Sequence, residues 1–240
     1  MLLNKKIEPP FFEIGPKAYM YGDEMVSLAR VIDAASREYD VRVILTPQYT
    51  DISRVAEATE NVLVFAQHMD SLVVGRGLGA VLPEAVKAAG AVGVMLNHVE
   101  KQLTVAELKA CIRRAEEVGL FSIVCADSIA EAAAIARFAP DIIVCEPSEL
   151  IGTGQTSDAD YVRASTDAVK SINPEIQVLQ AAGISNGDDV YGVIRAGAEA
   201  TGTTSGIMKA ADKEKMVHEM LSAVRRAWNE RYSYVDICGS

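Results

Sequence analysis

The chain has 240 residues, half of them hydrophobic, and carries a formal net charge of −10 at pH 7. Nucleic acids and anionic membrane surfaces attract clustered Lys and Arg, so this acidic balance argues against both as partners. No stretch approaches the roughly 18 apolar residues of a membrane span, and the opening MLLNKKIEPP lacks the long apolar run of a signal peptide.

Short runs rich in β-branched residues alternate with segments of helical periodicity along the chain. Eight runs predict strands: FFEI at Phe11, VRVIL at Val41, VLVF at Val62, AVGVML at Ala91, FSIVC at Phe121, DIIVC at Asp141, IQVLQ at Ile176 and a weaker one near Ala200. Between them, apolar residues three and four apart predict helices, for example over 24–39, 104–119 and 213–232.

Local signals agree with these elements. Thr104 and Glu107 form a capping-box pattern, Gly119 stands where a helix should end, and Pro83 suits a first helical turn. Eight strand-then-helix units without a linker predict one domain over 1–240. Continuously apolar strands indicate burial on both faces. We therefore expect a (β/α)8 barrel, with a doubly wound open sheet as the alternative, because periodicity does not show closure.

The cysteines and histidines give no sign of a disulfide framework or a zinc site. The four cysteines are scattered without a CxxC pair: Cys111, Cys125, Cys145 and Cys238. Such scatter fits a reducing, cytoplasmic compartment. The histidines lie far apart in the chain: His68, His98 and His218. We expect no dedicated metal site.

In a barrel of this kind, residues that do chemistry follow the C-terminal ends of the strands. Lys17 follows the first predicted strand, although an ordinary solvated lysine is the better interpretation when the residue is taken alone. His98 and Glu100 follow the fourth. A neutral imidazole there can donate a hydrogen bond to a substrate carbonyl. A histidine paired only with backbone is an equally good interpretation.

The segment CEPSELIGTG, over 145–154, places an acid after the sixth strand and a glycine-containing loop behind it. Partial burial raises the pKa of a carboxyl such as Glu146, which suits a general base better than a structural salt bridge. Gly152 begins a Gly-Thr-Gly stretch whose backbone N–H groups can face an anion while the loop swings.

Glycine-rich loops also follow the seventh and eighth predicted strands. They contain Ser185 in the first loop, and Thr204 and Ser205 in the second. These are the loops in which (β/α)8 barrels often hold phosphate. The GRGLG stretch at Gly75 does not directly follow a strand, so a nucleotide site there is not expected.

Together these motifs resemble the triosephosphate isomerase family, particularly its shorter archaeal branch. The likeness covers nearly the whole chain and rests on these segments: AQHMD at Ala66, VLPEAVKAAGAVGVMLNHVE at Val81, IRRAEEVG at Ile112, EPSELIGTG at Glu146 and AAGIS at Ala181. The resemblance implies a TIM barrel that isomerises an aldose and a ketose phosphate through an enediol. It implies no metal or organic cofactor, and a role in glycolysis and gluconeogenesis.

The resemblance also implies roles for individual residues. Glu146 falls on the family's catalytic base, His98 on its electrophile, and Lys17 on the cation that holds the anionic substrate. Glu100 falls on the supporting acid beside the histidine. The phosphate-gripping amides fall on Gly152, Ser185, Thr204 and Ser205. Family members form dimers, and archaeal ones tetramers, so the resemblance implies a homodimer or homotetramer.

Three positions depart from the family pattern. Gly15 stands for an asparagine, Val99 for a serine, and Leu78 for a threonine in a loop that reaches toward the neighbouring subunit. A glycine at position 15 leaves room, and a site that has lost a polar group rejects analogues poorly. A larger substrate, such as a four-carbon ketose phosphate, is therefore one interpretation, and tolerated drift is the other.

Two further classes of function stay open. One is an aldolase in which Lys17 forms a Schiff base, and the other is a non-catalytic protein that only binds a phosphorylated metabolite. The C-terminal segment YSYVDICGS, over 232–240, extends beyond the last predicted helix. Its apolar residues are expected either to pack under the barrel or to contact a partner.

Overall fold

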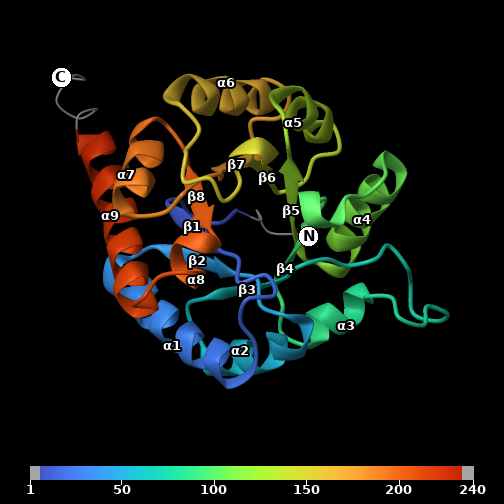
Figure 1. The fold of residues 1–240 in the computed structure, drawn as a ribbon. Coiled ribbons are helices and arrows are strands. Elements are labelled where there is room, and N and C mark those ends of the chain that lie inside the picture. The colour runs from blue at the N-terminus through green and yellow to red at the C-terminus, as the bar shows by residue number, and fades with distance from the viewer. Residues whose placement is uncertain (1–5, 234–240) are drawn as a thin grey trace.

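The computed structural model describes residues 6–233 as a barrel of parallel strands surrounded by helices, viewed along its axis in Figure 1. The strands are β1 (Phe11–Ile14), β2 (Arg42–Leu45), β3 (Leu63–Ala66), β4 (Gly93–Leu96), β5 (Phe121–Ala126), β6 (Ile142–Cys145), β7 (Gln177–Gln180) and β8 (Ala200–Thr203). Each lies within two residues of its predicted position.

Helices and short 3-10 turns connect the strands. The helices are α1 (Gly22–Tyr39), α2 (Ile52–Ala58), α3 (Pro83–Ala88), α4 (Val105–Val118), α5 (Ile129–Ala136), α6 (Ala159–Lys170), α7 (Gly187–Arg195), α8 (Ser205–Met208) and α9 (Lys213–Ser233). The 3-10 turns are η1 (Tyr49–Asp51), η2 (Val99–Lys101) and η3 (Ser148–Leu150).

The sheet closes on itself, which confirms the barrel and excludes the open-sheet alternative. Strand β1 pairs in parallel with β2, where Phe11 is opposite Arg42, and also with β8, where Phe11 is opposite Ala200. All eight strands follow one another in chain order around the barrel. Closure brings every strand's C-terminal end to the same mouth, whatever its position in the chain.

Alternation along the strands divides the core into two layers. Phe12 and Ile14 of β1 pack outward, in the apolar cluster between barrel and helices. Phe11 points inward and packs with Phe65 and the other inner residues. Burying one such aromatic side chain contributes roughly 1.5–3 kcal/mol. The same alternation directs Glu13, two residues after Phe11, toward the barrel interior.

The local signals around α3 and α4 are also confirmed. Thr104 caps α4 through a reciprocal pair of hydrogen bonds with Glu107. Gly119 ends that helix in a left-handed conformation with φ 77°, and Pro83 is the first residue of α3. Most of the predicted tail, 234–240, lies outside the described residues. The single domain over 1–240 stays a prediction.

The segment between β3 and α3, over 67–82, projects away from the ring of helices in Figure 1. It carries exposed apolar side chains, with Val73 64%, Val74 71% and Leu78 109% accessible. Monomeric proteins seldom expose such a cluster without using it. No helix among residues 6–233 is long and apolar enough to cross a bilayer.

Candidate active site

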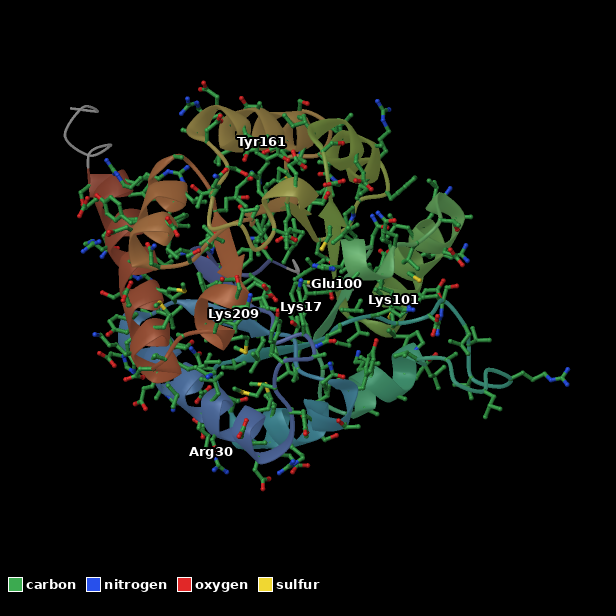
Figure 2. All side chains as sticks on the ribbon, in the orientation of Figure 1. Lys17, Arg30, Glu100, Lys101, Tyr161 and Lys209 are labelled. Atoms are coloured by element: carbon green, nitrogen blue, oxygen red, sulfur yellow. The ribbon has the colours of Figure 1, made fainter. Side chains whose placement is uncertain are left out.

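A cavity of about 690 Å³ opens at the C-terminal ends of the strands. Its walls include predicted site residues from the exits of β1, β4, β6 and β8: Gly15, Lys17, His98, Glu100, Glu146 and Thr204. In Figure 2, Lys17 and Glu100 lie beside each other near the barrel axis, whereas Arg30 and Tyr161 belong to the outer helices. The fold thus brings residues up to 189 positions apart, from 15 to 204, into one hollow.

His98 and Glu146 face each other across this cavity. Nε2 of His98 lies 3.8 Å from Oε2 of Glu146, and both side chains are largely buried. That gap is too long for a direct hydrogen bond. A small substrate beside the two groups therefore meets an imidazole and a carboxylate at once.

Local backbone geometry sets the tautomer of His98. Its Nδ1 accepts a hydrogen bond from the backbone N–H of Glu100 at 3.0 Å, so the proton of the neutral ring lies on Nε2. Burial lowers the pKa of His98, with a further contribution from the charge of Lys17 against an opposing one from Glu100. The ring is therefore a neutral donor whose Nε2–H points toward the cavity.

Glu146 has the opposite shift. Burial raises the pKa of its carboxyl above the ordinary value, while the charge of Lys17 lowers it in part. The residue follows β6 directly, where its backbone N–H is held by the carbonyl of Ala126 at 3.0 Å. A carboxylate of raised basicity beside a neutral hydrogen-bond donor suits proton transfer at a carbon next to a carbonyl.

Lys17 is held in an uncommon backbone conformation, with φ 48°. Side-chain amides from the segments that follow β2 and β3 bind its carbonyl oxygen: Gln48 donates at 2.6 Å and Gln67 at 3.0 Å. Its ammonium group contacts Oε1 of Glu100 at 2.7 Å. This hydrogen bond lowers the pKa of Glu100. The two residues thus form an ion pair at the cavity edge.

The residues that were expected to grip phosphate are only partly gathered. Thr204 lines the cavity, whereas Gly152, Ser185 and Ser205 do not. The backbone N–H of Ser185 instead donates to the Asp189 carboxylate at 2.8 Å.

The loop after β6 is held on its C-terminal side, because a Cβ atom at Gly183 would lie 1.9 Å from the carbonyl oxygen of Gln155. Gly152 has a φ of 73° and open space around it. This part of the loop does not line the main cavity.

The three departures from the family pattern lie in different surroundings. Gly15 and Leu78 both line the main cavity. Val99 lines a smaller hollow that also includes Glu146. The space beside Gly15 is not empty, because a Cβ atom there would lie 3.0 Å from Oε1 of Glu13.

Glu13 is the site residue that the sequence analysis missed. It lines the cavity, is 8% exposed, and burial raises the pKa of its carboxyl to about 8, with the charge of Glu146 adding to the shift. A signal was present, since period-two alternation puts 11, 13 and 15 on one face of the first strand. In residues 6–233, no three His, Cys, Asp or Glu side chains are grouped to hold a metal ion.

Known triosephosphate isomerases resemble this chain over most of its length. A family model described as Triosephosphate isomerase matches residues 14–221. A triosephosphate isomerase from Methanobacterium bryantii is 36% identical over 227 residues, covering 92% of this chain and all of the relative. One from Methanosarcina mazei is 37% identical over 220 residues, covering 90% of this chain and 99% of the relative.

A solved structure shares the architecture at lower sequence identity. The crystal structure of triosephosphate isomerase from Bartonella henselae superposes with a TM-score of 0.71 at 18% identity. The match covers 90% of this chain and 98% of that one. At this identity the likeness bears on the fold, and the archaeal relatives bear on the family.

Proposed function

This chain belongs to the triosephosphate isomerase family, and we propose that it interconverts dihydroxyacetone phosphate and glyceraldehyde 3-phosphate. The observation that carries the proposal is the 3.8 Å approach of His98 Nε2 to Glu146 Oε2, with the pKa values of the two groups shifted in opposite directions. In this proposal the enzyme serves glycolysis and gluconeogenesis in the cytoplasm.

Each side chain has a distinct part in the proposed reaction. Glu146 takes a proton from the carbon next to the carbonyl and returns it to the neighbouring carbon. The Nε2–H of His98 donates to the carbonyl oxygens as charge develops there. Lys17 offsets the negative charge of the enediolate, and Glu100 positions the Lys17 ammonium through their ion pair.

The phosphate group is proposed to lie between the loops that follow β6, β7 and β8. Thr204 already borders the cavity, and Ser205 begins the short helix α8 behind it. Gly152 and Ser185 complete the grip when the loop over 147–156 closes. Closure excludes water and keeps the enediol phosphate from losing its phosphate.

The structure gives less support for a four-carbon substrate than the sequence does. That interpretation depended on room beside Gly15, and the carboxyl of Glu13 occupies this room. Assays with dihydroxyacetone phosphate and with a tetrulose phosphate separate the two substrates. Turnover of the tetrulose phosphate alone would overturn the three-carbon proposal.

The central test replaces Glu146 by Gln, which keeps the shape of the side chain and removes the base. We expect kcat to fall by about 10²–10⁴-fold, as is usual when a general base is lost, while substrate affinity changes little. The matched control is Glu116→Gln on the exposed face of α4, which should leave kcat unchanged.

Two outcomes contradict the proposal. Full turnover by Glu146→Gln removes this residue as the base. A wild-type protein that binds triose phosphate without turning it over is a binding protein instead. Borohydride trapping with substrate addresses the aldolase alternative, because an isomerase of this kind forms no Schiff base with Lys17.

A homodimer or homotetramer is part of the proposal. The exposed side chains of Val73, Val74 and Leu78 in the projecting segment support it, because apolar clusters of this kind are typical of subunit interfaces. Leu78 also lines the cavity. Assembly would therefore cover one edge of the candidate site.

A further inference from the structure

Glu13 places a carboxyl group on the floor of the active-site cavity. Most of its inner-layer neighbours are apolar, such as Val144 and Leu179. The residue is 8% exposed, and it lines the same cavity as Glu146 and Lys17. The proton-transfer scheme above makes no use of this second acid.

Two glycines clear the space that this carboxyl occupies. A Cβ atom at Gly15 would lie 3.0 Å from Oε1 of Glu13 and 3.2 Å from the hydroxyl of Thr204. A Cβ atom at Gly202, which pairs with Glu13 across β1 and β8, would lie 2.8 Å from the backbone carbonyl oxygen of Glu13 and 3.0 Å from its Oε2. Real Cβ atoms seldom come this close to their neighbours, so both positions favour glycine beside the Glu13 carboxyl.

The groups that face Glu13 leave it mostly protonated at neutral pH. Burial and the Glu146 carboxylate raise its pKa to about 8, against smaller lowering contributions from the Thr46 hydrogen bond and the Lys17 charge. The thiol of Cys125 on β5 faces the same region and has a strongly raised pKa of its own. A protonated carboxyl carries one O–H donor and keeps acceptor capacity.

The internal hydrogen bonding of this carboxyl engages only one of its two oxygens. Thr46 donates its hydroxyl proton to Oε1 at 3.2 Å, and it is the only hydrogen-bond partner of the Glu13 side chain within residues 6–233. Oε2 of Glu13 has no hydrogen-bond partner within residues 6–233, and the residue lines the cavity. This oxygen is therefore available to a molecule in the cavity.

We propose that Glu13 is a further substrate-contacting residue, whose carboxyl group hydrogen-bonds an oxygen at the sugar end of the phosphorylated substrate. The inference rests on the proposed function, because it places a sugar phosphate in this cavity. A neutral carboxyl fits that role, since an ionised one would repel the anionic substrate. The Glu13 carboxyl occupies the space that a side chain at position 15 would need. It therefore provides a polar group where Gly15 has no side chain.

The test compares Glu13→Leu, which removes the hydrogen bond, with Glu13→Gln, whose amide still donates but does not titrate. For dihydroxyacetone phosphate, we expect Glu13→Leu to lower kcat/KM by about 10- to 100-fold, as the loss of a strong hydrogen bond does. Glu13→Gln should retain more of kcat/KM than Glu13→Leu. The melting temperature of Glu13→Leu should equal or exceed that of the wild type, because an apolar group replaces a buried acid.

The pH profile separates the proposed contact from a structural role. In the wild type, kcat/KM should fall as pH rises through about 8, because Glu13 then ionises. Glu13→Gln should lack this alkaline fall. The matched control is Asp33→Asn, a buried acid on α1 outside the cavity, which should retain it. An alkaline fall that persists in Glu13→Gln overturns the proposal. This pH measurement does not need Glu13→Leu, so it decides the question even if that variant does not fold.

A binding measurement makes the test independent of turnover. Calorimetry would compare sn-glycerol 3-phosphate with inorganic phosphate, since only the first has a sugar-like end. Glu13→Leu should weaken binding of glycerol 3-phosphate and leave the affinity for inorganic phosphate unchanged. Equal effects on both ligands, or none on either, would overturn the contact. A wild type that binds glycerol 3-phosphate through Glu13 without isomerising triose phosphate would instead disprove the proposed function alone.

Discussion

At the residue scale, burial acts on two neighbouring groups in opposite directions. It raises the pKa of the Glu146 carboxyl and lowers that of the His98 imidazole, because it disfavours the charged form of each. The outcome is a strong base beside a ring that stays neutral. Lys17 affects both groups in the same sense, since its charge lowers both pKa values.

The acidic side of the pH profile follows from these shifts. Only ionised Glu146 accepts a proton, and its pKa lies above the ordinary 4.5, so kcat/KM should fall as pH drops toward and below that raised value. His98, with its pKa lowered from 6.5, should add no loss near neutral pH. Steady-state kinetics from pH 4 to 7 measures this. An acidic fall centred at or below pH 4.5 would contradict the raised pKa.

At the element scale, the sequence predicted the strands and helices but few of the contacts that position individual side chains. The strands were found from apolar runs, and the start of α4 from the capping box at Thr104 and Glu107, because both signals are local. Ser185 was expected at the phosphate, but its amide donates to the Asp189 carboxylate in the first turn of α7. Alternation already placed Glu13 on the inner face of the first strand, but its surroundings were not predictable, because Gly202 of β8 and Thr46 after β2 are distant in the chain.

Replacement by alanine should change stability in opposite directions at Gly183, which follows β7, and at Gly192, which lies in α7. At Gly183 a Cβ atom would meet the backbone of Gln155 at 1.9 Å, and φ is +68°, so Gly183→Ala should displace the loop after β6 and reduce stability and turnover. At Gly192, exposed within α7 and with open space around it, alanine should stabilise by about 0.5–1 kcal/mol. Urea unfolding of both variants checks the signs. Equal effects would contradict the predicted contact at Gly183.

At the scale of the whole molecule, barrel closure is what assembles the site. The repeated strand-helix units made the fold predictable from sequence, because the architecture follows from their number and order. Assembly with other copies was not predictable from the residues alone, since the projecting segment over 67–82 shows periodicity of neither helix nor strand. Its exposed valines are evident only once the surrounding chain is folded.

The projecting segment supports a prediction about assembly. The wild type should sediment as a dimer or a larger homo-oligomer, and Val74→Asp should shift it toward the monomer, because a charge buried in an interface costs binding energy. Val74→Thr, which keeps the shape of the side chain without a charge, is the matched control and should remain associated. Analytical ultracentrifugation gives the masses. A monomeric wild type would refute this role for the segment.

The crowding around Glu13 also constrains how the protein can change over time. An asparagine at position 15 would crowd the present acid, whose Oε1 is 3.0 Å from the required Cβ position. A longer side chain at position 15 therefore requires the Glu13 carboxyl to move or the side chain at position 13 to shorten. A lineage that shortens position 13 first avoids this crowding.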